Sequence, residues 1–405
     1  MGRDTVPMPV LLDVQAARER VLAAVRPLPI EEVPLAAALG RVLAADLHAG
    51  GDVPPFTNSA MDGFAVLSGP AGRVLRIVGE SRAGSPAGAA VTDGTAIRIS
   101  TGAMLPDGAD AVIMVERTQE DTGAATVTLD AEVQAGQNVR GAGEDMRAGT
   151  VVLPAGTVIA AASLGIAAGA HAGCLRCRRR PRVAVLATGD ELVPPGAPLL
   201  PGQIHNSNSL TLAALATEAG AEVVLVGHVA DAEQATREAI RAALKRADVL
   251  VLSGGVSVGA HDHVKDALLA CGVAEDFWRV ALRPGKPTWF GTRGEQLVFG
   301  LPGNPVSSMV TFLLFARPAV RALQGADPAA RRVQMPLADA VPQTPGRDEL
   351  VRVSFVDDAA ALTGPQGSHV LTSMLGADGL ARIPAGEGEL AAGTLVDVEL
   401  LGPAR

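Results

Sequence analysis

From residue 181 onward, short runs of β-branched residues alternate with longer helical stretches, and this alternation limits the possible folds more than any other feature of the sequence. Parallel strands need long crossover connections, usually helices, so the pattern predicts a mostly parallel, doubly wound α/β domain. The expected strands cover residues 183–187, 223–227, 249–253, 277–282 and 297–300. The expected helices cover residues 209–218, 232–246, 262–270 and 305–323.

The segments on either side of this domain follow other patterns. Residues 9–26 have helical apolar spacing, and a second short helix is expected before Leu43. Residues 50–147 contain short β-rich runs separated by Gly, Pro and Asp, which indicates a small β domain. Strands are expected again at 333–337, 350–356 and 395–400. A chain of 405 residues is longer than one core usually organises, so we expect three or four domains.

Charge and cysteine content exclude several functional classes. The formal net charge of −9 repels polyanions, and the one dense basic run, at residues 176–182, has no interleaved aromatic residues, so we predict no nucleic-acid binding. Cys174 and Cys177 form a single C-x-x-C without the second pair of a zinc site. Three cysteines and no apolar signal stretch predict a cytoplasmic protein. The longest uncharged stretch, 155–176, is too weakly apolar to favour a membrane span.

Polar and glycine residues follow every expected strand of the α/β domain. Open parallel sheets bind ligands outside the carboxyl ends of their strands, so we expect these residues to share one edge. In chain order they are Thr188, Gly189 and Glu191, then Asp231, then Ser253, Gly254, Gly255 and Ser257 with Asp262, then Arg283 and Lys286, and finally Pro302, Gly303 and Asn304.

Two of these loops have the composition of a phosphate cradle. SGGVSVG (253–259) and the turn at 302–305 each place glycine just before an expected helix, where backbone N–H groups and the helix dipole favour anions. A tight strand-to-helix turn is the alternative for either loop alone. Glu191, Asp231 and Asp262 would place three carboxylates at the same edge, which favours bound magnesium, although Asp231 alone could be a helix cap. Arg283 and Lys286 would hold an oxyanion or phosphate.

Ordered motifs over nearly the whole chain carry a resemblance. They are PPFTNSAMDGFA (54–65), ISTGAMLPDGADAVIMVE (99–116), GED (143–145), TGDELVPPG (188–196), SGGVSVG, RPGKP (283–287), LPGNPVSS (301–308) and QGSH (366–369). With these motifs the sequence resembles the MoeA family of molybdopterin molybdenumtransferases, which is related to the gephyrin E domain. It departs from the commoner family pattern at Ala260, where an acidic residue is frequent.

The resemblance implies an elongated subunit of four parts. These are domain I (1–49 with 146–180), an inserted β domain II (50–145), the molybdopterin-binding domain III (181–326) and a β-barrel-like domain IV (327–405). It also implies a homodimer in which the active site lies at the subunit interface. In that arrangement Asp62, Thr101 and Asp145 would come from the partner subunit.

The resemblance further implies a reaction and a set of site residues. Adenylyl-molybdopterin and molybdate would be the substrates, with magnesium-dependent release of AMP, and other molybdenum-cofactor biosynthesis proteins would be transient partners. The implied catalytic residues are Asp62, Asp145, Glu191, Asp231 and Asp262, of which Glu191 and Asp262 would bind the metal. Contacts to the cofactor or molybdate are implied for Thr101, Arg279, Arg283, Lys286, Arg352 and Ser368.

Two other functions are compatible with a molybdopterin-binding fold. A non-catalytic scaffold would bind molybdopterin without turnover, but the acidic residues Asp62, Glu191 and Asp262 are retained. A molybdopterin adenylyltransferase would carry out the preceding step with a similar α/β domain, but such proteins lack the β domains expected here. Turnover assays separate the three hypotheses.

Overall fold

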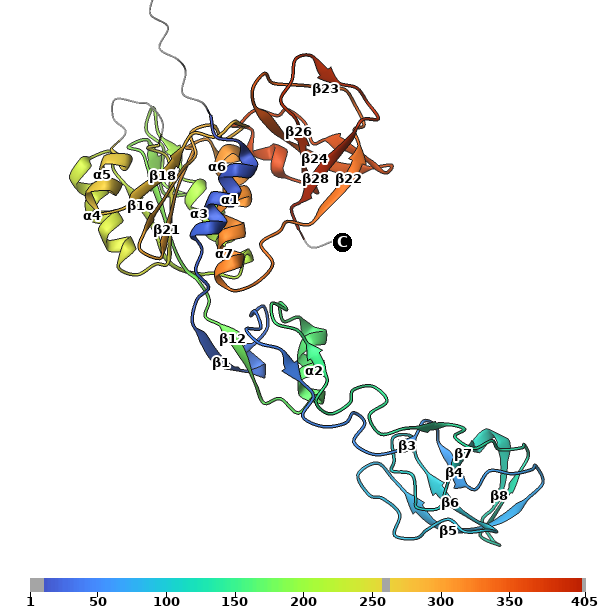
Figure 1. Cartoon of the computed structure of the whole chain (residues 1–405). Coiled ribbons are helices and arrows are strands. Elements are labelled where there is room, and N and C mark those ends of the chain that lie inside the picture. The colour runs from blue at the N-terminus through green and yellow to red at the C-terminus, as the bar shows by residue number, and fades with distance from the viewer. Residues whose placement is uncertain (1–10, 257–262, 403–405) are drawn as a thin grey trace, which may run out of the picture. The chain divides into compact units, whose positions relative to one another are not determined.

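The computed structural model describes residues 11–256 and 263–402. Contacts divide the chain into two compact units (Figure 1). One unit contains the described residues of 1–31, 40–44 and 177–405, and the other contains residues 32–39 and 45–176. The chain passes between the units along β1 (Ile30–Pro34) and β12 (Cys174–Arg178), which pair with each other. The four-part division stays a prediction.

The first unit contains a six-stranded sheet that confirms the expected α/β fold. Its order is β16 (Glu222–Val229), β13 (Arg182–Thr188), β17 (Val249–Ser253), β21 (Gln296–Leu301), β20 (Trp289–Arg293) and β18 (Ala274–Trp278). The first four strands are parallel. β20 was not expected from the sequence, and it is antiparallel to both neighbours, so β18 runs in the same direction as β21.

Helices cover both faces of this sheet (Figure 1). Alternate residues of β13 point to opposite faces, so Val183 and Val185 belong to one core cluster and Ala184 and Leu186 to another. The first cluster includes α3 (Asn208–Glu218), α6 (Pro305–Thr311), a π-helical turn (Phe312–Ala316) and α7 (Arg317–Leu323). The second includes α4 (Glu233–Leu244) and α5 (Val264–Ala270).

The continuous helix Pro305–Leu323 is long and apolar enough to cross a membrane by length and composition. However, 78% of its most apolar window is buried inside the structure. Packing against the sheet accounts for this hydrophobicity, as in the core helix of many α/β domains.

The N-terminal helix packs on the α/β domain. α1 (Val14–Ala24) starts at Asp13, whose Oδ1 accepts from Gln15 N (2.7 Å) and Ala16 N (3.1 Å). Ala17 and Val21 are buried in the same core cluster as α3 and α7. The helix expected at 9–26 is therefore confirmed over residues 14–24, while residues 11–13 and 25–26 are not helical.

The strand expected at 277–282 is two strands with different partners. The chain bends at Arg279, which has a left-handed φ of 75°. After the bend, β19 (Leu282–Arg283) leaves the α/β sheet and pairs in parallel with the start of β24 (Asp348–Val356) in the C-terminal sheet. A continuous apolar pattern cannot reveal such a change of sheet, because both strands bury the same residue types.

The C-terminal sheet has the order β19, β24, β26 (Gly379–Ile383), β28 (Leu395–Leu400) and β22 (Arg332–Pro336), with β25 (Ala359–Leu362) also on β24. The three expected strands are present, and β25 and β26 are additional. Val351, Val353, Ala381 and Val398 form its own core. The remaining elements of this unit are β14 (Leu192–Val193), β15 (Ile204–His205), β23 (Val341–Pro342), β27 (Glu389–Leu390) and the 3-10 turn η4 (Leu371–Met374).

The second unit contains the expected β domain. Its six-stranded sheet has the order β7 (Ala111–Met114), β4 (Gly63–Val66), β6 (Thr95–Ile99), β5 (Val74–Ser81), β9 (Thr126–Leu129) and β8 (Thr118–Asp121). Two pairs complete its strands, β2 (Leu47–His48) with β11 (Val151–Leu153) and β3 (Asn58–Ser59) with β10 (Val139–Arg140). Its helical segments are α2 (Ala161–Gly169) and the 3-10 turns η1 (Leu35–Ala37), at the short helix expected before Leu43, and η2 (Val115–Arg117).

Candidate active site

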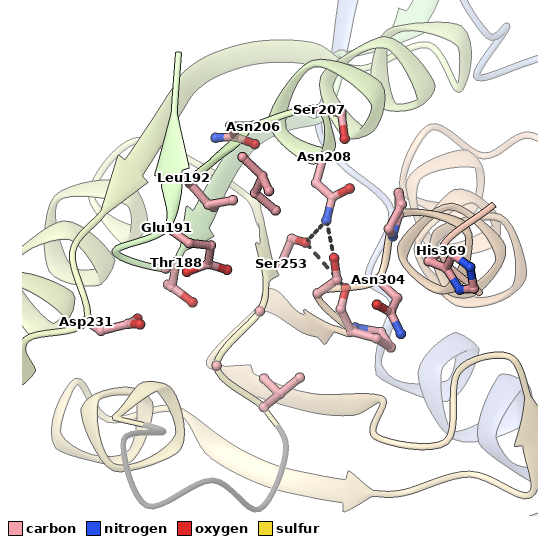
Figure 2. A pocket seen from close by; sticks show the side chains of 18 of the residues that line it. Thr188, Glu191, Leu192, Asn206, Ser207, Asn208, Asp231, Ser253, Asn304 and His369 are labelled. Carbon is pink, nitrogen blue, oxygen red and sulfur yellow. Dashed lines mark hydrogen bonds between the residues drawn. The ribbon is translucent and has the colours of Figure 1, made fainter. Parts of the chain in front are cut away.

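A cavity of about 780 Å³ lies at the carboxyl edge of the α/β sheet (Figure 2). Ten residues singled out from the sequence line it, namely Thr188, Gly189, Glu191, Asp231, Ser253, Gly254, Gly255, Pro302, Gly303 and Asn304. They come from the ends of four different strands, as expected for ligand binding at a parallel sheet. The structure thus brings these side chains and turns together, while their individual roles stay predictions.

The turn after β13 brings the Glu191 carboxylate close to the backbone of Gly189. Gly189 has a φ of 146°, and a Cβ at this position would lie 2.4 Å from Glu191 Oε2. Glycine is therefore required both for the backbone conformation and for the position of the Glu191 side chain. The Gly189 carbonyl accepts a hydrogen bond from His228 Nε2 (2.7 Å), which fixes the turn from the neighbouring strand β16.

A buried hydroxyl lies between this turn and the next. Thr188 Oγ1 is buried and has no hydrogen-bond partner among the described residues. A Cβ on Gly254 or Gly255 would lie 3.0 or 2.9 Å from this oxygen. A buried polar atom without a partner costs free energy, and such atoms in a pocket wall are commonly satisfied by a ligand. The missing side chains of the two glycines leave space beside this buried hydroxyl.

The loop after β17 begins with two left-handed glycines. Gly254 and Gly255 have φ values of 91° and 65°, and a Cβ on Gly255 would meet Val264 Cγ2 at 2.4 Å. The loop therefore turns sharply against the start of α5 and presents backbone to the cavity. The predicted site residues Ser257 and Asp262 lie outside the described residues, as does Ala260.

The turn after β21 is connected to the C-terminal domain. Asn304 precedes α6 with an extended backbone, and its side chain does not cap that helix. Its Nδ2 donates instead to Ser368 Oγ (2.9 Å), and Val306 N donates to Ser368 O (3.1 Å). His369, next in the chain, lines the cavity. The structure thus links Ser368 to the turn at 302–305, and its contact with the cofactor or molybdate stays a prediction.

Three of the four expected cationic residues lie in the connection between β18 and β20. Arg279 places its guanidinium 3.9 Å from the Trp278 ring centroid, and Lys286 O accepts from Val280 N. Arg283 Nη1 contacts Thr344 Oγ1 (3.1 Å) and Glu349 Oε2 (3.3 Å) in the C-terminal domain. None of the three lines the cavity, although Pro287 beside them does. In this structure Arg283 is held by a carboxylate.

Arg352 lies completely buried in the C-terminal domain below the Ser368 loop. Its Nε donates to Ser373 Oγ (3.1 Å), and its Nη1 has no partner among the described residues. Burial lowers the pKa of Arg352 to about 10, while nearby Glu349 acts in the opposite direction. Gln366 holds the same loop, because its Oε1 accepts from Arg352 N and its Nε2 donates to Arg352 O.

Several pocket residues were not expected from the sequence. They are Leu192, Ile204, His205, Asn206, Ser207, Asn208, Val256, Pro287 and His369. The run IHNSNS (204–209) could have been recognised, because it joins the first strand to the next helix and such connections lie at the carboxyl edge. Its consecutive polar side chains from His205 to Ser209, just before and at the start of α3, were the available signal.

Three predicted site residues lie in the second unit. Thr101 donates to Asp62 Oδ1 from its backbone N (2.7 Å) and its hydroxyl (3.2 Å), and both residues are exposed. Asp145 is also exposed, and its backbone N donates to Val53 O. The structure therefore joins Asp62 with Thr101 and leaves their relation to the cavity of a partner subunit untested.

The described residues contain no group of three or more His, Cys, Asp or Glu side chains placed to hold a metal ion. Glu191 and Asp231 both line the cavity. The third expected carboxylate, Asp262, lies outside the residues that the structure describes. The oxygen donors that are present are carboxylate and hydroxyl groups, which are the ligands that magnesium prefers.

Comparison with known proteins gives one consistent result over the chain. Residues 12–170 match the MoeA N-terminal region (domain I and II), residues 184–322 a probable molybdopterin binding domain, and residues 334–401 the MoeA C-terminal region (domain IV). A molybdopterin molybdenumtransferase of Haemophilus influenzae is 35% identical, with 96% of this chain and 98% of that protein covered. Molybdopterin molybdenumtransferase 2 of Mycobacterium tuberculosis is 38% identical, with 90% and 94% covered.

A solved structure agrees with these sequence matches. The molybdopterin biosynthesis MoeA protein from Pyrococcus horikoshii superimposes with a TM-score of 0.83 at 30% identity, covering 97% of this chain and all of that one. The similarity thus extends over both compact units and is not confined to the α/β domain.

Proposed function

This chain belongs to the MoeA family, and from that premise we propose that it is a molybdopterin molybdenumtransferase. In the proposed reaction, the molybdenum of molybdate bonds to the two dithiolene sulfurs of adenylyl-molybdopterin, and one molybdate oxygen leaves as water with the two thiol protons. A second water attacks the adenylyl phosphorus and breaks its bond to the bridging pyrophosphate oxygen. AMP and the molybdenum cofactor are the products. The Haemophilus influenzae and Mycobacterium tuberculosis relatives with this name match over at least nine-tenths of the chain.

The observation that carries the proposal is the single cavity at the carboxyl ends of four strands. It combines two glycine-containing turns, where backbone can approach a phosphate, with the carboxylates of Glu191 and Asp231. A phosphate-bearing substrate that requires a divalent cation fits this combination. Carboxylates alone would repel such a substrate.

We propose that the chain's own residues mainly bind and orient the two anionic substrates. The turns at 253–256 and 302–305 would hold the pyrophosphate, and Thr188 Oγ1 would donate to one of its oxygens. Arg279, Arg283, Lys286, Arg352 and Ser368 would contact the cofactor or molybdate, and the positive charge of the four basic side chains would offset the repulsion between the two anions. For this role Arg283 must exchange its contact with Glu349, which is possible because its side chain is 53% exposed.

The residues of the cavity fit a magnesium ion. Glu191 and Asp231 offer carboxylate oxygens, the buried Thr188 hydroxyl has no partner among the described residues, and Asp262 would add a third carboxylate. Bound magnesium would supply positive charge that stabilises the pyrophosphate as its bond to the adenylyl group breaks. Glu191 and Asp231 would also orient water for that cleavage.

We propose a homodimer in which Asp62, Thr101 and Asp145 complete the site of the partner subunit. In support, all three are exposed, and the two hydrogen bonds from Thr101 fix the Asp62 carboxylate without neutralising it. We also propose a cytoplasmic location and transient contact with other proteins of the same biosynthesis. All three cysteines are free thiols, which suits a reducing compartment.

Release of AMP tests the proposed function. Purified protein is mixed with adenylyl-molybdopterin, molybdate and magnesium chloride, and AMP is measured by chromatography. We expect AMP release that requires both molybdate and magnesium. Bound molybdopterin without turnover would favour the scaffold hypothesis, and ATP-dependent AMP transfer to molybdopterin would favour the adenylyltransferase. Either result would overturn the proposal.

A further inference from the structure

Asn208 connects two turns of the cavity that lie far apart in the sequence. It is the first residue of α3, and its Nδ2 donates to Ser253 Oγ (2.8 Å) and to the Gly303 carbonyl oxygen (2.7 Å), as Figure 2 shows. Ser253 ends β17, and Gly303 follows β21. One amide therefore bridges the starts of both glycine-containing turns.

The partners determine how the amide is oriented. A carbonyl oxygen can only accept, so the atom facing Gly303 must be the amide nitrogen. Its two hydrogens are then both used, one for each turn. Ser253 Oγ, which accepts from Asn208, is also within 3.4 Å of Pro302 O and of Ser308 Oγ. Ser253 and Ser308 are 2% and 1% exposed, so the serine side of this network is shielded from water, whereas Asn208 is partly buried and Gly303 is exposed.

Apart from the Asn208 bridge, the two turns come close to each other through their backbones at Gly254 and Gly303. Gly254 N donates to Leu301 O (3.1 Å) at the end of the sheet, and a Cβ on Gly303 would lie 3.7 Å from Gly254 Cα. Beyond that point Gly254 and Gly255 have left-handed conformations and turn away from the sheet. Because sheet pairing no longer fixes the spacing there, a side chain that binds both turns has a direct effect on it.

We propose that Asn208 is a positioning residue that holds these two turns at the spacing that receives the phosphate of the adenylyl group. This inference rests on the proposed function for the class of ligand. What it adds is the residue that sets the spacing of the two turns. Aspartate would fill the same space, but a carboxylate cannot donate. It would face the Gly303 oxygen without a bond and add negative charge beside Glu191 and Asp231.

AMP binding to the full-length protein tests the proposal without turnover. Calorimetric titrations with AMP and magnesium chloride are carried out on the wild type, Asn208→Ala, Ser253→Ala and the double variant. We expect affinity to fall about tenfold for Asn208→Ala and about threefold for Ser253→Ala, the size of a lost hydrogen bond. The double variant should bind no more weakly than Asn208→Ala, because either change breaks the same connection.

Two further measurements separate positioning from a loss of folding. In the turnover assay Asn208→Ala should raise KM for adenylyl-molybdopterin while kcat changes less, whereas partial unfolding would lower kcat at constant KM. Asn208→Asp should bind AMP more weakly than Asn208→Ala. Gln234→Glu adds the same charge on α4, outside the residues that line the cavity, and should bind AMP like the wild type.

The outcomes are distinct from those of the proposed function. Wild-type AMP affinity in folded Asn208→Ala, additive losses in the double variant, or no AMP binding by the wild type would each overturn this inference. If AMP binds and the variants respond as expected but adenylyl-molybdopterin is not cleaved, the proposed function fails and the positioning role of Asn208 stands.

Discussion

Asn304 and Ser368 are joined by a hydrogen bond of 2.9 Å from Nδ2 to Oγ, although they are 64 positions apart. Asn304 belongs to the cavity of the α/β domain, and Ser368 lies on a loop of the C-terminal domain. The backbone bond from Val306 to Ser368 lies beside it. The cavity wall is therefore built from both domains, and changes in the loop should alter ligand binding more than folding.

Ser368→Ala removes the hydroxyl that Asn304 contacts but keeps the backbone bond to Val306. We expect KM for the substrates to rise about threefold to tenfold and the free energy of unfolding to fall by less than about 1 kcal/mol. Steady-state kinetics and urea unfolding measure the two effects. Ser354→Ala, on β24, is the matched control and should leave KM unchanged. An unchanged KM in Ser368→Ala would contradict a role of this contact in binding.

Glu191→Gln and Asp231→Asn remove negative charge from the cavity at nearly constant shape. If these carboxylates bind magnesium and orient water, AMP release should fall at least about a hundredfold, and Asp262→Asn should behave alike. Because Glu191 and Asp231 are exposed, the melting temperature should change little. Glu222→Gln, an exposed residue at the start of β16, is the control. Full activity of Glu191→Gln would remove that residue from the proposed site.

Glu399 accepts from the buried Arg18 and the partly buried Arg317 and should contribute strongly to stability. Its carboxylate lies 3.0 Å from Arg18 Nη1 and 2.8 Å from Arg317 Nη2, with its own side chain 6% exposed. Glu399→Gln leaves one buried and one partly buried guanidinium group without this counter-charge, which should cost roughly 3 kcal/mol. Urea unfolding followed by circular dichroism measures this cost. Arg332, 3.7 Å away and half exposed, offers the control Arg332→Ala, which should cost less than about 1 kcal/mol.

Burial raises the pKa of the Cys177 thiol, which makes both its reactivity and its stability contribution depend on pH. The folded protein keeps this proton to higher pH than the unfolded chain, so the contribution is complete below the unfolded pKa of about 8.5 and is lost as the pH rises. Exposed Cys174 should react with a thiol reagent at pH 8 at once, and Cys177 only on unfolding. Cys177→Val should reduce the loss of stability above pH 9. Equal labelling rates would contradict the burial.

The proposed interface can be tested by mixing two inactive variants. If Asp62 acts in the site that contains Glu191 of the other subunit, a heterodimer of Asp62→Asn and Glu191→Gln has one intact site and one with both changes. Random reassortment should then restore roughly a quarter of the wild-type activity. AMP release after subunit exchange measures the recovery. No recovery, with heterodimers present, would show that each site uses residues of one chain.

The α/β fold was predictable because hydrophobic period is a local property. The four parallel strands and the helices over 208–218, 233–244 and 305–323 lie where the alternation placed them. The polar strand ends converge on one cavity for the same reason, since a parallel sheet brings all its carboxyl ends to one edge. The family motifs added what periodicity cannot supply, namely the chemistry.

What the sequence did not predict depends on contacts between distant segments. β20 follows a turn that the apolar pattern does not mark, and β19 joins another sheet through pairing with β24. Asn208 and His369 reach the cavity from a helix start and a C-terminal loop, and their residue types are ordinary at both places. Contacts of Arg283 with Glu349, over 66 positions, likewise require the assembled fold.

The pairing of β19 with β24 also limits how this polypeptide can be divided. Leu282 and Arg283 occupy the same side of β24 as β25, because Glu349 pairs with both Arg283 and Ile383, and Val353 with both Leu362 and Gly379. A fragment starting after residue 326 would lack this short strand and expose unpaired backbone at the beginning of β24. Gene fusions, deletions or domain exchange at that junction would therefore interrupt a sheet, even though the linear sequence suggests a clean break there.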